Sequence, residues 1–283
     1  MKKNLMAALC ALLVCVLTMT GASAEGSVAG ESDMTDVIDI VPEGMTPVTA
    51  DMLNDGTWFV NVDVSSSMFK VNGAEVTVEG GALTARLLMN SEAYTYMYPG
   101  EAEDAAAADE SAWIALETDG EDVHSFTMPV EGLNQGVVCA AFSARKQLWY
   151  PRTILLRADS LPLEAWKAEC LTTAASLGLA DGAYVCHVSL TGSGRATLQE
   201  EAGLKVEGGE CTCYIAFDTK KIDYVIVGGE KYEPTSTDGG AAFTLPLPCF
   251  DLPVTIVVDS TAIKPAVEVT YTMTFDSASI KPV

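Results

Sequence analysis

Short runs of alternating apolar and polar residues follow one another through residues 51–160. They are rich in β-branched and aromatic residues and bounded by Gly, Asn or Pro, at 57–64, 74–78, 82–89, 125–128, 137–142 and 152–157. Alternation places every second side chain on one face of a strand, so each run predicts a β-strand. Gly80-Gly81 supplies the positive φ angles of a tight hairpin. The pattern predicts an all-β protein of antiparallel sandwiches.

Two segments have a helical pattern instead. Residues 101–111 are acidic and include four consecutive alanines, which predicts a solvated surface helix. The second segment, 161–177, has an apolar stripe at helical spacing, formed by Leu163, Trp166, Cys170 and Leu177. With Pro162 in its first turn, this stripe predicts a short helix within a linker over 161–180. The stripe either packs against a domain or forms a partner site.

The chain repeats itself, which fixes the expected domain organisation. The matched segments occur in the same order in both copies: 55–60 with 181–186, 78–81 with 206–209, 126–129 with 243–246, and 159–160 with 276–277. From residue 126 onward an offset of 117 holds without a gap. Repeated order of this kind indicates duplicated structural units. We expect two tandem β-sandwich domains, at 51–160 and 181–283, joined by the helical linker.

The N-terminal residues have the pattern of a secretory signal peptide. Lys2 and Lys3 precede an apolar run over 6–19, and the small residues 22–24 form a cleavage site, so residues 1–24 are expected to be removed. Residues 25–50 are acidic and contain no basic residue, which predicts a solvated leader. No later run is long enough for a membrane span. The product is expected to be exported to the extracellular space, and to stay at the cell surface only through a partner.

Composition narrows the classes of partner. The chain of 283 residues has 39 acidic and 16 basic side chains, a formal net charge of -23. Phosphate backbones and anionic membrane surfaces repel such a protein, which excludes nucleic acid as a partner. Six cysteines follow the signal peptide: Cys139, Cys170, Cys186, Cys211, Cys213 and Cys249. They are either buried thiols or one or two disulfides, or Cys211 and Cys213 bind a metal.

One segment suggests a metal-dependent adhesion site. Asp63, Ser65 and Ser67 have the Asp-x-Ser-x-Ser spacing with which von Willebrand factor A domains bind a hard cation. That fold requires a helix directly after the motif, whereas residues 69–78 predict a turn and another strand. The second copy also lacks the motif. The context therefore argues against a metal site, and we predict none.

The first copy resembles the NEAT (NEAR-transporter, iron transport-associated) family of secreted haem-binding domains. The resemblance rests on segments 55–58, 66–69, 76–81, 126–130 and 150–156, and the second copy is similar but more diverged. It implies immunoglobulin-like sandwiches in which haem lies between a short lip and a late hairpin. On that hairpin the family has a Tyr-x-x-x-Tyr pair, which supplies the axial phenolate and its hydrogen-bond partner.

Carried over by position, the resemblance implies a lip formed by Ser66, Ser67, Met68 and Phe69. Its implied haem-iron ligand is Tyr150, and Ile154 stands where the family has the second tyrosine. In the second copy the offset aligns Val267 with Tyr150 and Tyr271 with Ile154, so Tyr271 is the candidate there. Each copy thus has one tyrosine of the pair.

The same region is unusual on composition alone. Basic and aromatic side chains gather in a window of 13 residues: Arg145, Lys146, Trp149, Tyr150, Arg152 and Arg157. A planar aromatic ligand with carboxylates could stack on the rings and pair with the cations, and tyrosinate is an established haem ligand. The alternatives are that the aromatic residues pack on the sandwich while the charges balance local carboxylates, or that the window is a peptide or glycan surface.

No catalytic motif accompanies these features. The chain has neither a Gly-x-Ser-x-Gly nor a His-Glu-x-x-His sequence, and no cysteine has a histidine partner that the sequence can identify. We expect a non-enzymatic binding protein of haem or iron-acquisition type, with haem or a similar planar ligand on the first copy. A surface or transport protein is a further expected partner. The alternative is an adhesion or spacer module that binds protein or carbohydrate without haem.

Overall fold

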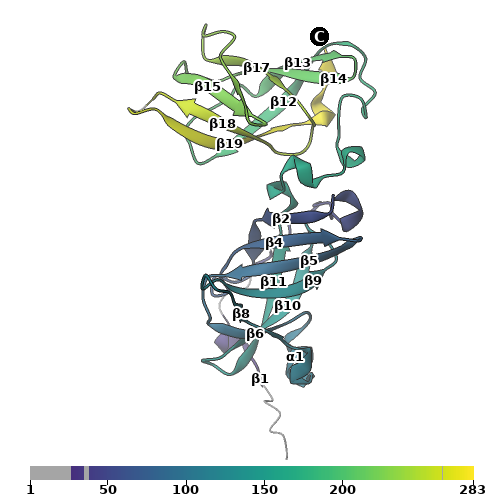
Figure 1. Cartoon of the computed structure of the whole chain (residues 1–283), viewed down its shortest axis with the longest axis vertical. Coiled ribbons are helices and arrows are strands. Elements are labelled where there is room, and N and C mark those ends of the chain that lie inside the picture. Colours follow the sequence, from purple (N-terminus) through teal and green to yellow (C-terminus); the bar gives the residue numbers. More distant parts are fainter. Residues whose placement is uncertain (1–26, 35–37, 263) are drawn as a thin grey trace, which may run out of the picture.

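The computed structural model describes residues 27–34, 38–262 and 264–283, so the expected signal peptide lies outside the described residues. The described chain is mostly antiparallel β-structure with little helix, which confirms the all-β prediction. Its sheets enclose two separate hydrophobic cores, and we call the two parts the first and second β-bodies. Figure 1 shows them end to end along the long axis of the molecule.

Two sheets form the first body. One has the strand order β2 (Gly56–Val60), β4 (Val71–Glu79), β5 (Ala82–Met89), β9 (His124–Val130) and β8 (Glu117–Thr118). The other has the order β1 (Ser27–Val28), β11 (Leu148–Leu156), β10 (Gly136–Ser143), β6 (Tyr94–Tyr98) and β7 (Ile114–Ala115), with β3 (Val62–Val64) also paired to β11. Only β1 pairs in parallel among these described strands. Gly80 and Gly81 have φ angles of 57° and 83°, which confirms the predicted tight hairpin.

The second body is one sheet of nine strands. Its order is β16 (Glu230–Tyr232), β15 (Ile222–Val227), β18 (Val254–Ser260), β19 (Val267–Phe275), β12 (Gly182–Gly192), β13 (Glu201–Glu207), β14 (Glu210–Ala216) and β17 (Ala242–Pro246), with β20 (Lys281–Pro282) on β12. The order β12-β13-β14-β17 parallels β2-β4-β5-β9, and β19-β18-β15 parallels β11-β10-β6. The two bodies therefore repeat one pairing scheme.

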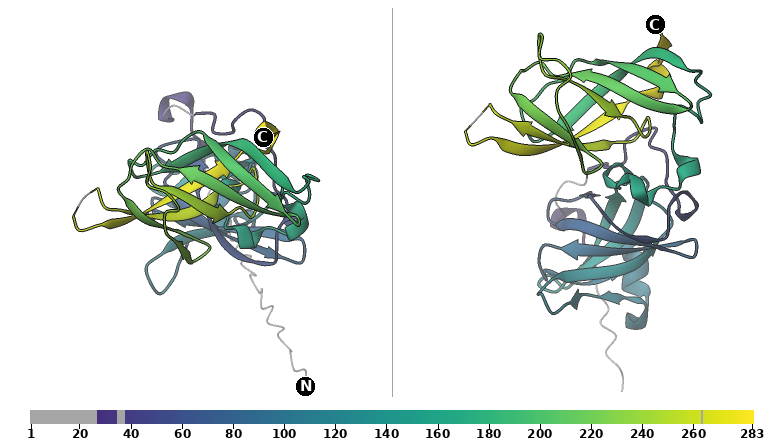
Figure 2. Two further views of the ribbon diagram at one scale, coloured as in Figure 1. Left: turned by 90° about the horizontal axis from the view of Figure 1, so that it is seen from above. Right: turned by 45° about the horizontal axis from the view of Figure 1, so that its top comes forward.

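The linker differs from the prediction, because residues 161–177 do not form a continuous helix. They form the 3-10 turns η5 (Leu163–Ala165) and η6 (Ala168–Cys170), between the preceding turn η4 (Ala158–Ser160) and β12. Trp166 packs into the first core and Leu163 against the second, while Leu171 contacts both. A helix would hold these side chains on one stripe, whereas here they serve two cores on opposite sides. The right-hand view of Figure 2 shows the linker passing between the bodies.

The predicted acidic helix forms in part. The helix α1 covers Ala102–Ala107 and is followed by the turn η3 (Glu110–Ala112). Ala102 and Ala105 are completely buried, so one face of the helix is packed rather than solvated as predicted. No helix in the described ranges is long and apolar enough to cross a membrane.

The leader is also more structured than the sequence suggested. It contains β1 and the turns η1 (Glu31–Asp33) and η2 (Ala50–Met52), and a further turn, η7 (Ser277–Ser279), precedes β20 near the other end. Ala29 and Val48 are buried in the first core. The small apolar residues Ala29 and Val48 of the leader therefore pack on the first body, while the acidic residues that the structure describes there are exposed to solvent.

Candidate ligand site

The β10–β11 hairpin positions the residues that the sequence singled out. Tyr150 lies opposite Ala141 and Trp149 opposite Phe142 in the antiparallel register. Because successive side chains of a strand point to opposite faces, Tyr150, Arg152 and Ile154 share the face toward the first core, and Trp149 lies on the other. The expected single cluster is therefore divided between the two faces of the sheet.

Tyr150 is buried, with 6% of its surface exposed. Its ring meets Tyr94 of β6 edge to face at 6.3 Å between centroids, and the guanidinium carbon of Arg152 lies 4.9 Å from the ring centre. Burial raises the pKa of the Tyr150 phenol, and the charges of Asp33 and Tyr94 add to this effect, while Arg152 opposes it. The phenol is thus held in its neutral form in this closed arrangement.

Arg152 is the most unusual residue of the cluster. It is 5% exposed, and its described neighbours include no carboxylate at ion-pair distance. One terminal nitrogen donates to the carbonyl of Pro151 at 2.8 Å and the other to the hydroxyl of Tyr94 at 3.2 Å, while Nε has no partner. A buried cation without an anionic partner is strongly unfavourable in a low-dielectric interior. Its two tyrosine rings compensate only in part through cation–π contact.

The lip expected from the family resemblance lies against this hairpin. The Ser65 amide donates to the Thr153 carbonyl at 3.0 Å, and the Thr153 amide donates to Ser65 Oγ at 2.9 Å. Phe69 packs edge to face on Tyr94 at 5.3 Å. Ser66 and Phe69 are buried, whereas Ser67 and Met68 are exposed, and Met68 has 61% of its surface free. The turn over 65–69 thus closes over the Tyr94–Tyr150 pair.

The leader adds a second cover beside Tyr150. Val28 pairs with Trp149, and the Ala29 amide donates to the Trp149 carbonyl at 2.8 Å. Farther along, Met34 packs against the first core, and the Ile38 amide donates to the Ser65 carbonyl at 3.0 Å. The leader therefore contacts both the hairpin and the 65–69 turn. The sequence did not predict this packing of the leader, because the leader has few apolar residues among many acidic ones.

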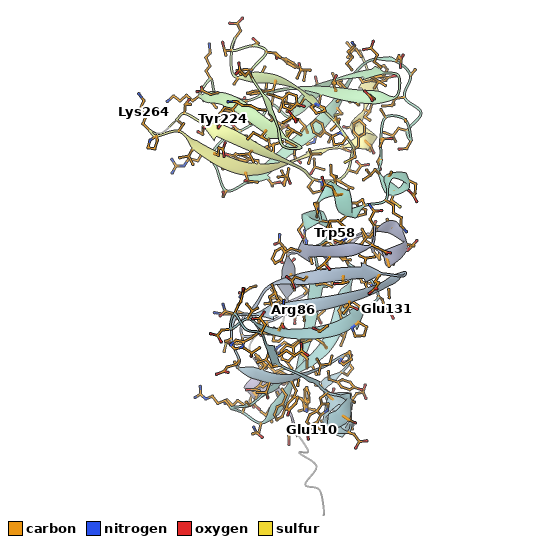
Figure 3. The ribbon with its side chains drawn as sticks, viewed as in Figure 1. Trp58, Arg86, Glu110, Glu131, Tyr224 and Lys264 are labelled. Carbon is orange, nitrogen blue, oxygen red and sulfur yellow. The ribbon has the colours of Figure 1, made fainter. Side chains whose placement is uncertain are left out.

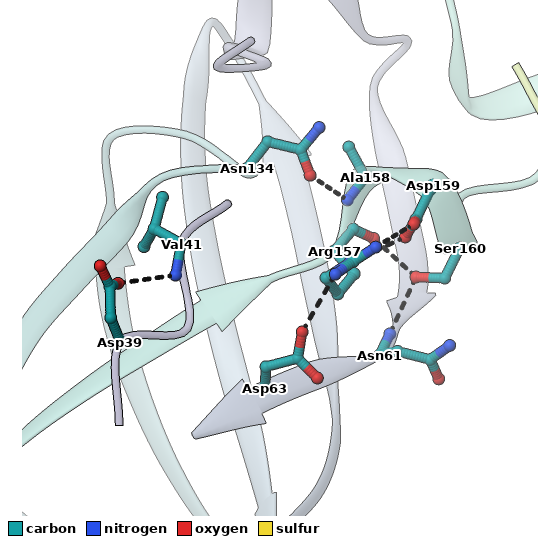
Figure 4. A network of polar contacts seen from close by, with 9 residues as sticks. All are labelled: Asp39, Val41, Asn61, Asp63, Asn134, Arg157, Ala158, Asp159 and Ser160. Carbon is teal, nitrogen blue, oxygen red and sulfur yellow. Dashed lines mark hydrogen bonds and ion pairs between the residues drawn. The ribbon is translucent and has the colours of Figure 1, made fainter. Parts of the chain in front are cut away.

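The remaining basic residues of the window lie elsewhere. Arg145 and Lys146 are exposed in the turn between β10 and β11. Arg157 pairs with Asp63 at 3.2 Å and with Asp159, as Figure 4 shows. Of the four basic residues, only Arg152 faces the Tyr150 ring.

The same contacts bear on the metal motif. The Asp63 carboxylate accepts from Arg157, and Ser65 Oγ accepts from the Thr153 amide, so these two oxygens serve the fold. In the described chain no group of three or more His, Cys, Asp and Glu side chains could hold a metal ion.

Trp149 belongs to an aromatic cluster on the outer face of its sheet. It meets Trp113 edge to face at 5.0 Å and Phe142 at 5.2 Å, and it packs with Ala102 and Ala105 of α1. Tyr96 completes the cluster and donates to Glu110 at 3.1 Å; Figure 3 labels Glu110 at the end of the first body away from the linker. The indole Nε1 of Trp149 has no hydrogen-bond partner. Trp149 therefore stabilises the packing of α1 and does not reach Tyr150.

The second body has no equivalent cluster around its candidate tyrosine. Tyr271 is 4% exposed, and its hydroxyl accepts from the Ala196 amide at 3.1 Å. Its ring fills the space beside Gly192 and Gly194, where a Cβ atom would clash with it. Val267, at the position that aligns with Tyr150, is exposed. Tyr271 is a packing residue in this arrangement.

All six cysteines that follow the expected signal peptide are unpaired thiols, and five of them, all except Cys170, are buried. Burial raises the pKa of Cys139, Cys186 and Cys213 to about 12, and that of Cys211 and Cys249 to about 11. Thiols with such pKa values remain protonated and unreactive at neutral pH.

Tyr94 is the site residue that the sequence analysis overlooked. It contacts Phe69, Tyr150 and Arg152 at once, and it begins the alternating Tyr94, Tyr96, Tyr98 series of β6. That alternation would place Tyr94 on the same face as Tyr96, but a register shift in the β6–β10 pairing puts Tyr94 in the first core and Tyr96 in the outer cluster, so the sequence pattern could not have identified it.

No model of a known protein family matches the chain, and no curated protein sequence is significantly similar to it. The site is therefore judged on its chemistry. A cation between two aromatic rings suits a planar ligand that carries carboxylates. Iron ligation by Tyr150 does not fit the closed arrangement, because the phenol is buried, its pKa is raised, and Ile154 replaces the second tyrosine.

Proposed function

We propose that the chain is an exported, non-enzymatic binding protein whose first β-body binds a planar aromatic carboxylate, with haem or another tetrapyrrole as the specific candidate. In this proposal each body is an immunoglobulin-like sandwich of the NEAT type. The first carries the ligand, the second is a structural partner, and a surface or transport protein is the expected recipient.

The buried Arg152 guanidinium is the observation that supports this proposal. Folding leaves a cation without an anion between Tyr94 and Tyr150. An incoming carboxylate would supply the missing charge, and an aromatic ring system would replace the rings that now pack on each other. If the residue at this position served only to stabilise the fold, an apolar side chain would stabilise it more than an unpaired arginine does.

Binding requires that the cover open. Asp33 lies close enough to Tyr150 to raise the pKa of its phenol, Met34 packs against the same core, and Phe69 of the 65–69 turn packs on Tyr94. A ligand must therefore displace at least one of these two segments. Over residues 27–34 the leader is held by the short β1 pairing, the Ala29 bond and the packing of Ala29 and Met34 on the first core. Segments with few buried contacts open at low free-energy cost.

The experiment is a titration of haemin into residues 25–283, followed by absorbance in the Soret region. We expect a saturable Soret shift whose apparent affinity is lower in Arg152→Met, which removes the cation that would pair with the ligand carboxylate. Arg145→Met is the matched control, since Arg145 is exposed in the turn of the same hairpin and the variant should bind as the wild type does.

Removal of residues 25–34 should increase haemin affinity, because the leader no longer competes for the site. The absence of a saturable shift in both the complete and the shortened chain would contradict the tetrapyrrole proposal. Equal haemin affinity in the wild type and Arg152→Met would show that haemin binds elsewhere.

A further inference from the structure

Two adjoining cavities lie where the linker passes between the bodies. The larger measures about 630 Å³ and is lined mainly by polar side chains, among them Asn61, Ser160, Thr191, Thr255, Thr272 and Thr274. The smaller measures about 520 Å³ and is lined largely by proline and aliphatic side chains, including Leu163, Pro246 and Val254. Pro162, Pro253 and Thr255 line both, so the cavities are neighbours, and we call the two together the junction groove. Each volume is within the range of small-molecule sites.

Several polar groups of the groove are available to a ligand. Among the described contacts, the hydroxyls of Thr255 and Thr274 and the amide of Asn61 have no side-chain hydrogen bond, whereas Thr191 and Thr272 bond to each other at 3.0 Å. In Figure 4 the backbone N–H of Asn61 donates to Ser160 Oγ, whereas no dashed line reaches its side-chain carboxamide. The groove thus offers groups that both donate and accept, supplied by both bodies.

The charge of the groove restricts the ligand. Asp159, Asp251 and Glu164 line it, and neither cavity is lined by a Lys or Arg side chain. Asp159 already accepts from Arg157, and Asp251 from the amide and hydroxyl of Ser277 at 2.9 and 2.6 Å. An anionic ligand would be repelled, and Asp159 and Asp251, the two carboxylates of the polar cavity, are already hydrogen-bonded within the protein. A neutral ligand is therefore favoured over a charged one.

The strand pairing beneath the groove favours a sugar over an extended peptide as the ligand. Thr272 and Thr274 lie on β19, which pairs with β18 on one side and β12 on the other. An extended peptide binds by adding to a free strand edge, and β19 has none here. A ligand at this face must instead be recognised by side-chain hydroxyls, with an apolar surface for the proline-lined cavity. A sugar ring combines many hydroxyls with an apolar C–H face.

We propose that the junction groove binds a neutral oligosaccharide, with hydroxyl groups at Thr255, Thr274 and Asn61 and a ring face against Pro162 and Pro253. This site is separate from the tetrapyrrole site and does not depend on it. Because both bodies and the linker line the groove, the bound sugar also fixes the bodies relative to each other.

The test is an array of neutral oligosaccharides screened with residues 25–283, followed by calorimetric titration of the strongest hit. The double variant Thr255→Val, Thr274→Val removes two hydroxyls but keeps the branched shape that strands favour. We expect it to bind about tenfold more weakly, the loss of two hydrogen bonds. Thr270→Val is the control, since Thr270 is exposed on the same strand and does not line either cavity.

Weaker binding in the double variant, with normal binding in Thr270→Val and unchanged thermal unfolding of both, supports the proposal. Several results overturn it: no neutral oligosaccharide bound, only sulfated or sialylated glycans bound, or equal binding by the wild type and the double variant. Equal loss in Thr270→Val would also overturn it, because the sugar would then lie outside the groove.

Discussion

At the residue scale, two neighbours in sequence have unrelated roles. Trp149 and Tyr150 were expected to form one ligand surface, but strand alternation sends them to opposite faces of the sheet. The predicted strand began at residue 152, whereas β11 begins at Leu148, so the prediction left both residues outside the strand that separates them. The contacts of Arg152 with Tyr94 were not predictable either, because they join residues from β6 and β11, and no local pattern gives the pairing of distant strands.

Arg152 leads to a prediction about stability. Replacing it in Arg152→Met removes a buried, unpaired charge and keeps much of the side-chain volume, so the free energy of unfolding should stay equal or rise by up to about 2 kcal/mol. Urea unfolding measures this, with Arg145→Met, which is exposed, as the control expected within about 0.5 kcal/mol of the wild type. A decrease of more than about 1 kcal/mol in Arg152→Met would show that the guanidinium stabilises the fold.

The buried thiols predict a pH dependence. In the unfolded chain thiols deprotonate from about 9, whereas in the folded chain the pKa of Cys213 is raised to about 12 by burial. The folded state therefore retains protons that the unfolded state loses, so stability is complete below pH 9 and decreases as the pH rises toward 12. Urea unfolding at pH 8 and pH 10 should show a decrease.

The decrease should be smaller in Cys213→Ala than in the wild type. Cys170→Ala is the control, because Cys170 is only half-buried and should leave the dependence unchanged. Equal dependence in all three proteins would exclude Cys213 as a source of the effect.

At the element scale, periodicity identified strands better than helices. Alternation located most strands of the first body, since each has one face on a core. The linker stripe at Leu163 and Trp166 has helical spacing, but its side chains pack into two cores on different sides. The apolar stripe of a helix faces only one core, whereas separate 3-10 turns can direct side chains toward both. Sequence periodicity cannot reveal that a segment lies between two cores.

The helix α1 offers a matched test of its buried face. Ala105 is completely buried against the Trp149 cluster, while Ala107 on the same helix is exposed. Ala105→Glu should lower the free energy of unfolding by about 2–4 kcal/mol, because it forces a charged side chain into a packed site. Ala107→Glu should change it by less than about 0.5 kcal/mol. Equal effects would mean that α1 is not packed on the sheet.

At the scale of the whole molecule, the linker joins the two bodies rather than separating them. Trp166 bridges to Leu53 of the first body, and Thr172 bridges to Phe250 of the second. Leu171 and Leu252 pack against both cores. The repeat in the sequence predicted two similar units, but similarity between two copies gives no information about the contacts between them.

These contacts predict coupled unfolding. The wild type should unfold in one calorimetric transition, and the double variant Leu171→Ala, Leu252→Ala should show two, because the shared apolar contacts are lost. Leu177→Ala is the control, as Leu177 is an exposed residue of the same linker. Two transitions in the wild type would show that the bodies unfold independently.

The parallel pairing of β1 with β11 has a consequence for the order of folding. Ser27 and Val28 leave the ribosome long before Leu148 and Trp149, the residues with which they pair. The first body therefore cannot complete its sheet until the late hairpin has been synthesised, and such distant contacts slow folding. Until then the leader has no partner strand. Its acidic composition keeps it in solution during this time, because a charged chain with few apolar residues stays solvated and resists aggregation.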